Sequence, residues 1–201
     1  MRLRYILFLS FILPIASLAQ GWGLGLRLGD PTGVSAKYYK SRLSAEFNLG
    51  WSYPVRGYDY RDYFYKKYPI GHGYEYIDYR SSSSVDFQMH ILWSNPIKEV
   101  KNLKLYAGLG PQFRYRTFYY DYYDLNYRGI VLSDIYYGYD IGLDGTFGLE
   151  YFIPDLPVAV FFDGTLFLEF ADQPLALWPQ FGIGARYNFF GDNQLIGKKK
   201  K

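Results

Sequence analysis

Apolar and polar side chains alternate along much of this chain with a period of two. The clearest case lies near the C-terminus, where Phe181, Ile183, Ala185, Tyr187 and Phe189 share one face and smaller or polar residues share the other. Residues two apart lie on the same face of a β-strand, so this segment is predicted to be a strand with one apolar face. A strand near the end of a chain leaves an unpaired edge. A closed barrel removes that edge by pairing the last strand with the first.

The same alternation predicts seven earlier strands, which together with the closing strand at 178–190 make an all-β, eight-stranded antiparallel barrel. The predicted strands span residues 22–28, 34–39, 43–52, 82–93, 103–116, 133–152 and 158–170. Two tyrosine-rich stretches, Tyr53–Arg80 and Thr117–Leu132, break the pattern and are predicted to be loops. Both are odd-numbered connections, and every even-numbered connection is short. Transmembrane barrels have short periplasmic turns and longer extracellular loops, so the order predicts an up-and-down barrel with both termini in the periplasm.

The N-terminus has the pattern of a secretory signal peptide. Arg2 and Arg4 precede an apolar run from Tyr5 to Ile15, and small residues follow up to Ala19. Cleavage after Ala19 is expected. A membrane anchor is the alternative, but the run is shorter than the roughly 20 residues a helical span needs and Pro14 interrupts it. The predicted organisation is a signal peptide at 1–19, a barrel at 20–190 and a basic periplasmic tail at 191–201.

Composition agrees with an exported membrane barrel. Aromatic residues make up 22% of the chain, with 24 tyrosines, yet the mean hydropathy is only −0.17. Only alternate strand residues face lipid in a barrel, which keeps the mean hydropathy low. The absence of cysteine excludes disulfides and thiolate metal sites. The mature chain would carry 20 basic against 19 acidic residues, so nucleic acid is not an expected partner.

The charged residues of the strands fall on the polar faces. In a membrane barrel these faces point into a lumen of eight-strand width, which side chains just fill, so opposite charges are expected to pair there. A soluble lipocalin-like barrel would put the apolar face inside instead. Glycine, frequent on the polar faces, suits a crowded lumen better than a solvent-exposed strand. The predicted lumen charge network comprises Arg27, Lys37, Glu46, Asp86, His90, Arg114, Arg116, Asp140, Asp144, Glu150, Asp163, Glu169 and Arg186.

Aromatic residues near the strand ends are predicted to form the interfacial girdles of a membrane barrel. They are Trp22, Trp51, Trp93, Tyr151, Phe170, Tyr187 and Phe189. The segments GWGLGLRLGDPTGVSAKYY (21–39) and FGIGARYNF (181–189) resemble the small eight-stranded outer-membrane β-barrel proteins common among Bacteroidetes-type bacteria. The resemblance covers nearly all of the mature chain. It implies outer-membrane lipid and lipopolysaccharide as surroundings, and recognition of the closing strand by the barrel-insertion machinery.

Candidates for catalytic or metal chemistry are few. The histidines are His72, in a predicted loop, and His90, on the polar face of the fourth strand. A run of serines at 82–84 is more typical of a strand entry than of a nucleophile, so no enzyme activity is expected. His90 with Asp86 and Asp140 suggests charge pairing rather than a metal site. The aspartates of the second loop do not have the spacing of a calcium loop. No cofactor or metal is expected.

The two predicted loops are the candidate binding regions. Tyrosine with glycine, serine and aspartate is the adaptable contact chemistry of recognition surfaces. A protein or glycan ligand is therefore expected at these loops, and the alternative is that tyrosines at the membrane interface only support them. The candidate contact residues are Tyr58, Tyr60, Tyr63, Tyr65, Tyr119, Tyr120, Tyr122 and Tyr123.

The leading hypothesis for function is an outer-membrane barrel with a side-chain-filled lumen and a structural, interaction or adhesion role. A narrow channel, or a transport- or secretion-associated component, is the first alternative. A lipid A-modifying enzyme is the second. The basic run Lys198–Lys201 is interpreted as a solvated end or as a contact for anionic headgroups.

Overall fold

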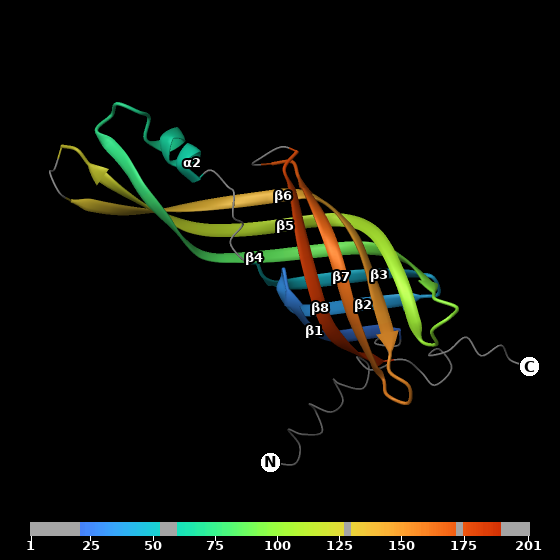
Figure 1. The fold of residues 1–201 in the computed structure, drawn as a ribbon. Helices are drawn as coiled ribbons and strands as arrows, with labels where there is room; N and C mark the ends of the chain where they lie inside the picture. Colours follow the sequence, from blue (N-terminus) through green and yellow to red (C-terminus); the bar gives the residue numbers. More distant parts are fainter. Residues whose placement is uncertain (1–20, 53–59, 127–129, 172–174, 190–201) are drawn as a thin grey trace, which may run out of the picture.

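Eight antiparallel strands close into one barrel in sequence order, as predicted (Figure 1). The computed structural model describes residues 21–52, 60–126, 130–171 and 175–189. The signal peptide, the tail and Tyr58 lie outside these ranges. The strands are β1 (Trp22–Gly29), β2 (Thr32–Lys40), β3 (Leu43–Trp51), β4 (Tyr74–Pro96), β5 (Leu103–Asp124), β6 (Val131–Phe152), β7 (Val158–Glu169) and β8 (Leu177–Phe189), and one helix, α2, spans Tyr60–Lys67.

The closing strand pairs with the first strand, which confirms the expected closure. The register runs without interruption from Trp22 opposite Phe189 to Gly29 opposite Gly182. No strand edge therefore remains along this seam of the ring. Within the described residues, no helix is long and apolar enough to cross a membrane.

Side chains inside the ring are polar and buried, whereas the alternate, outward side chains are apolar and exposed. Arg27 and Arg186 are buried, and their chain neighbours Leu26 and Tyr187 are exposed. A soluble barrel would have the opposite distribution, so the lipocalin-like alternative does not fit. An apolar outer band around a polar interior is the arrangement of transmembrane β-barrels.

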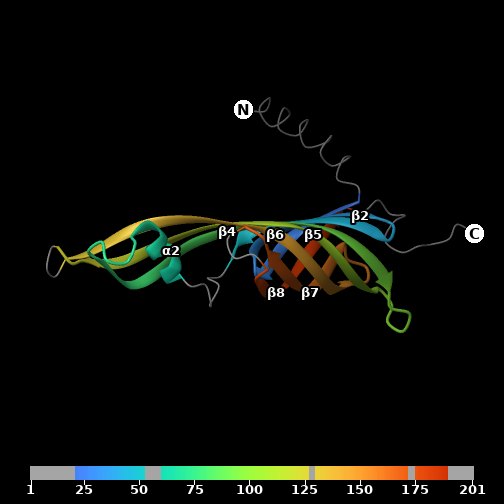
Figure 2. The same cartoon turned by 90° about the horizontal axis from the view of Figure 1, so that it is seen from above.

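The prediction that Tyr53–Arg80 and Thr117–Leu132 are loops is wrong where β4, β5 and β6 continue into these stretches and where α2 forms. β4 begins at Tyr74, β5 continues to Asp124 and β6 begins at Val131. Residues 74–83, 117–124 and 131–137 of these strands form a three-stranded sheet beyond the ring, called the extension here (Figures 1 and 2). We call the end of the barrel that carries it the extension end, and the opposite end, with the β2–β3, β4–β5 and β6–β7 connections, the turn end.

Two features explain why the alternation of apolar and polar residues did not predict the extension. Tyrosines occupy both faces of these strands, so apolar and polar residues do not alternate, although tyrosine favours strands. In addition, the β4–β5 register shifts between Tyr76 and Asp78 and again between Ser81 and Ser83. A bulge moves every later side chain to the other face and breaks a period of two.

Glycines let neighbouring strands approach closely inside the ring. At Gly110 on β5, an added Cβ would overlap the carbonyl oxygen of Met89 on β4. Gly145 on β6 faces outward, and a Cβ there would lie 3.7 Å from the nearest atom, the Leu109 Cδ2. The ring therefore needs glycine at Gly110 for steric reasons but not at Gly145.

We expect Gly110→Ala to destabilise the barrel by about 1–3 kcal/mol, because the backbone of β4 must move away from the new methyl group. Gly145→Ala is the matched control and should leave stability nearly unchanged. The measurement is the temperature at which the folded band is converted to the unfolded band on a detergent gel, comparing unboiled with heated samples. Equal conversion temperatures for both variants would contradict this account of the packing.

Candidate functional site

A cross-barrel ion cluster fills the lumen toward the turn end. Arg186 on β8 donates to Glu46 on β3 at 2.6 Å and to Glu150 on β6 at 3.0 Å. The Nζ of Lys37 on β2 donates to the other oxygen of Glu150 at 3.0 Å. The Arg186 guanidinium also lies 3.7 Å from the centre of the Phe161 ring. Strands that are not neighbours in the sheet are thus joined through the interior.

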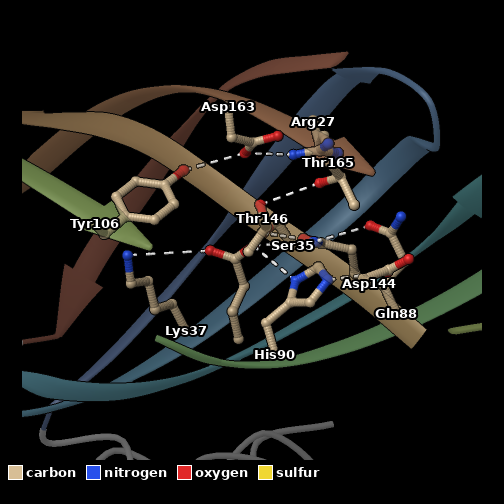
Figure 3. Close-up of polar contacts among 12 residues, drawn as sticks. Arg27, Ser35, Lys37, Gln88, His90, Tyr106, Asp144, Thr146, Asp163 and Thr165 are labelled. Atoms are coloured by element: carbon tan, nitrogen blue, oxygen red, sulfur yellow. Dashed lines mark hydrogen bonds and ion pairs between the residues drawn. The ribbon is translucent and has the colours of Figure 1, made fainter. Parts of the chain in front are cut away.

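Two further pairs cross the middle of the lumen (Figure 3). Arg27 on β1 donates to Asp163 on β7 at 2.6 Å, and the Tyr106 hydroxyl donates to the same carboxylate oxygen at 3.1 Å. His90 Nε2 on β4 lies 3.0 Å from an Asp144 oxygen on β6. Each charge thus has an opposite partner within hydrogen-bond distance.

A third set of charges lies toward the extension end. One oxygen of Asp86 accepts from Gln112 at 2.6 Å and from Arg114 at 3.2 Å. Arg116 donates to Asp140 on the neighbouring strand β6. All of these side chains are buried. The ion pairs therefore extend from one end of the ring to the other.

Every residue predicted for the lumen charge network lies inside the barrel and is at most 5% exposed. Glu169, the remaining member, accepts from the Trp178 indole at 3.1 Å. Apart from His90, the network holds five cations, Arg27, Lys37, Arg114, Arg116 and Arg186, and seven carboxylates, Glu46, Asp86, Asp140, Asp144, Glu150, Asp163 and Glu169. The histidine beside Asp144 is placed to offset part of this difference.

Neutral amides join the charged clusters, and the sequence reasoning did not assign them a role. Gln88 donates to Gln112 at 3.3 Å and to Gln180 at 3.0 Å. Asn48 donates to Gln88 at 3.3 Å and to Glu46 at 3.0 Å. Asn48, Gln88 and Gln112 share their polar faces with charged residues two positions away, and that is the signal from which their position could have been found. With them, hydrogen-bonded side chains also lie between the charged clusters of the lumen.

The predicted girdle aromatics divide between the two ends of the ring. Trp51 and Phe170 lie at the extension end, where β3 and β7 finish, and both are exposed on the outside. Trp93, Tyr187 and Phe189 are exposed at the turn end. The two remaining residues, Trp22 and Tyr151, are also at the turn end and are partly buried.

Helix α2 packs on the face of the extension that continues the lumen wall. Phe64 of α2 is fully buried, and its ring centre lies 5.3 Å from that of Tyr122 and 5.6 Å from that of Tyr76. Tyr120 and Phe118 complete the same aromatic cluster. The predicted contact residues Tyr120 and Tyr122 are buried against the helix. The interpretation that they present their rings to a partner is therefore wrong.

Polar contacts join the end of α2 to Asp134 on β6, and we call these contacts the latch. The Tyr68 hydroxyl donates to Asp134 at 2.8 Å, and Lys67 forms an ion pair with the same carboxylate. The hydrogen bond from Lys67 lowers the pKa of Asp134. Burial, followed by the hydrogen bonds to Tyr122 and Asp134, raises the pKa of Tyr68 above its ordinary range.

The outer face of the extension becomes polar beyond the ring. Arg80 on β4 donates to Asp121 on β5 at 2.9 Å and to the Ser133 hydroxyl on β6 at 3.3 Å. The hydrogen bond from Ser133 and then that from Arg80 lower the pKa of Asp121. Of the predicted contact tyrosines, Tyr123 is exposed on this sheet. Tyr119 on the sheet and Tyr65 on α2 are half-buried, and Tyr60 and Tyr63 belong to α2.

The two outer edges of the extension differ. On β4 the edge strand carries both register shifts and the charged residues Glu75, Asp78 and Arg80. β6 pairs with β5 without a register shift, and its other neighbour β7 reaches only as far as Gly142. No described strand pairs with the remaining edge of β6 from Val131 to Ile135. That segment has no register shift, carries the exposed apolar side chains Val131, Leu132 and Ile135, and contains one charged residue, Asp134.

The two histidines occupy different surroundings. His72 is exposed in the link between α2 and β4, with Nδ1 3.2 Å from the Pro69 carbonyl oxygen. His90 is enclosed in the lumen. Among the described residues, no group of three or more histidine, cysteine, aspartate or glutamate side chains is arranged to hold a metal ion.

Comparison with known proteins gives likeness at the level of the fold. No family model matches the sequence, and no curated protein matches it. The crystal structure of Ail, the attachment invasion locus protein of Yersinia pestis, matches with 12% identity over 84% of this chain and 98% of that chain, at a TM-score of 0.45. Neisserial surface protein A (NspA) matches with 11% identity over 83% of this chain and 94% of that chain, at a TM-score of 0.42. At these scores we draw no argument from either protein, and the Bacteroidetes-type resemblance stays a prediction.

Breaking the lumen cluster should destabilise the barrel strongly. Arg186→Met leaves Glu46 and Glu150 with less compensation in a buried site, and we expect a loss of about 3–5 kcal/mol. The matched control is Arg80→Met, which removes an arginine from an exposed ion pair and should change stability little. Urea unfolding in lipid bilayers, followed by tryptophan fluorescence, measures both variants. Equal unfolding midpoints would show that the lumen pairs do not stabilise the ring.

The attachment of α2 should depend on pH at both extremes. The lowered pKa of Asp134 means that its contribution to the attachment of α2 is complete above about pH 3.9, the ordinary aspartate value. That contribution is lost as the pH falls through the lowered pKa. The raised pKa of Tyr68 means that its contribution to the same attachment is complete below about pH 10. That contribution is lost as the pH rises through the raised pKa. Since the chain has no cysteine, spin labels at Ile70→Cys and Ile135→Cys report the distance between helix end and sheet.

We expect one narrow distance distribution at neutral pH and a broad one at both extremes. Asp134→Asn removes the carboxylate and should abolish the acid transition while leaving the alkaline one. A distribution that stays narrow when the pH falls below the lowered pKa of Asp134 and when it rises above the raised pKa of Tyr68 would contradict the latch.

Proposed function

We propose that this chain is an integral outer-membrane protein with a closed lumen and that it acts as a surface interaction protein through its extension. The exposed apolar band of the ring supports contact with membrane lipid. In the outer membrane the surroundings would be phospholipid and lipopolysaccharide, reached through the barrel-insertion machinery. We place the extension outside the cell and the short turns in the periplasm, because long elements of such barrels are extracellular.

The observation that carries this proposal is the regular strand edge on β6. β4, β5 and β6 continue beyond the ring, where they take no part in closing it. The edge Val131–Ile135 is not paired with a described strand and carries exposed Val131, Leu132 and Ile135, although the Ile135 N–H already donates to the Asp134 side chain at 2.9 Å. An extended protein segment binds such an edge through main-chain hydrogen bonds. The partner we propose is therefore a protein with an exposed, extended segment rather than a glycan.

A channel function fits the interior poorly. Lumen side chains from opposite strands are bonded to one another, as in the Arg186–Glu46 and Arg27–Asp163 pairs. Eight strands enclose a space that side chains fill. An ion would have to displace several buried ion pairs to cross, so we infer that the protein is not a pore.

A lipid-modifying enzyme is also a poor fit. The His90 ring is held by Asp144 and is enclosed, so a lipid substrate outside the barrel could not reach it. His72 is exposed, and its ring lies against a backbone carbonyl oxygen. We infer that neither histidine acts as a general base on a lipid.

Site-specific photocrosslinking on intact cells tests the proposed surface. The probe residue replaces Ile135 on β6 or, as the matched control, Ile77 on β4; both side chains are 39% exposed on outer strands of the extension. We expect a protein adduct from position 135 and none from position 77, because only β6 presents an uninterrupted edge. A charge on an edge strand opposes strand addition. Val131→Lys should therefore reduce the adduct.

Adducts of equal strength from both positions, or from neither, would contradict binding at the β6 edge. Stepwise conductance of the refolded protein in a planar bilayer would instead favour the channel alternative.

A further inference from the structure

A cluster of exposed cations lies at the turn end of the barrel. Lys40 and Arg42 flank the β2–β3 turn, and Lys98 and Lys101 lie in the β4–β5 turn. All four side chains are exposed, and Glu99 is the one acidic residue within the two turns. No ion pair joins these four cations to a carboxylate of the described chain.

The two turns are neighbours in the barrel, so the four cations form one patch. Leu43, at the start of β3, pairs with Trp93 near the end of β4. The Ser94 backbone N–H donates to the Arg42 carbonyl oxygen at 2.8 Å, which ties the two connections together. We call Lys40, Arg42, Lys98 and Lys101 the basic rim.

The basic rim lies directly beyond the apolar outer surface. Leu43, Trp93 and Leu105 are each about half exposed on the outside of the ring at this end. A membrane-facing tryptophan at such a position marks the boundary between hydrocarbon and headgroups. The cations of the basic rim lie beyond Trp93 at this end of the barrel and are therefore at the height of the lipid headgroups.

Among the described residues of the turn end, the exposed cations lie on one side. The β6–β7 turn has Asp155 and no cation between Ile153 and Pro157. The described residues at the start of β1 and the end of β8 also contribute no exposed cation to this rim. Lys104, the next cation along the chain, is half-buried, with its Nζ 4.7 Å from the centre of the Phe152 ring. The asymmetry indicates a localised site rather than a uniform charged belt.

We propose that the basic rim binds the phosphate headgroups of anionic phospholipid in the membrane leaflet at the turn end. Cations beside an anionic headgroup layer gain electrostatic attraction that falls off within a Debye length. Lysine and arginine on two adjacent turns are placed to hold one such headgroup between them. This inference rests on the proposed membrane location but not on the proposed partner at β6.

Native mass spectrometry of the refolded mature protein in detergent tests the proposal. The probes are phosphatidylglycerol and phosphatidylcholine, titrated separately. We expect phosphatidylglycerol to bind at least tenfold more tightly, and Lys40→Gln/Arg42→Gln/Lys98→Gln/Lys101→Gln to remove that preference. About 1 kcal/mol per cation corresponds to roughly a fivefold loss for each one removed. Raising the salt concentration from 0.05 M to 0.5 M should weaken the preference in the unmodified protein.

The matched control is Arg61→Gln/Lys66→Gln/Lys67→Gln/Arg80→Gln, which removes the same charge from α2 and the extension and should leave the lipid preference intact. Loss of the preference in this control, or its persistence in the rim variant, would overturn the proposal. Competition by inorganic phosphate at the same concentration as the lipid would show an anion site without lipid selectivity, which also overturns it. Heat-modified gel mobility is measured for every variant. A protein that shows no folded band in detergent would refute the membrane barrel itself, whereas a folded barrel without lipid preference refutes the rim alone.

Discussion

The need to pair charges inside a narrow ring is the constraint on which this structure depends. Lumen side chains of an eight-stranded barrel cannot reach bulk water along most of their length, so each buried charge requires a partner inside the lumen. Arg186 meets this requirement by bonding to Glu46 and Glu150 at once. The resulting pairs join β8 with β3 and β6, which are not neighbours in the sheet. Strand pairing fixes the wall of the barrel, and the ion pairs fix its cross-section.

The extension is the same sheet after the lumen has ended. On the inner face of β5, Arg114 and Arg116 lie within the ring, and Phe118, Tyr120 and Tyr122 follow at the same two-residue spacing. Charged residues are suitable where an opposite wall supplies partners, but beyond the ring that wall is missing. Helix α2 takes its place and covers an aromatic surface instead. The change from charge to aromatic residues along one strand face therefore marks where the barrel opens.

The ring and its lumen could be predicted because both depend on a period of two. Arg27, Lys37 and Asp163 each alternate with apolar neighbours. In a closed membrane barrel this pattern places the charged residues inside and the apolar residues outside. The extension could not be predicted, because aromatic residues on both faces and two register shifts remove the period. Helix α2 was also missed. Its sequence, Tyr60–Lys67, is short and rich in tyrosine, a modest helix former, and packing of Phe64 against the sheet holds it in place.

The two outer edges of the extension differ in how well they are protected against pairing with a further strand. Free edges carry a risk of aggregation, and proteins counter it with bulges and charges. β4 has both devices, with register shifts beside Asp78 and Ser83. β6 has no register shift between Val131 and Ile135, and its one charged residue there, Asp134, is paired with Lys67 of α2. A regular edge with one charged residue, opposite an edge with two register shifts and three charged residues, is difficult to explain by folding alone, since both are outer strands of the same sheet. Binding of an extended partner segment at β6 gives the asymmetry a physical reason.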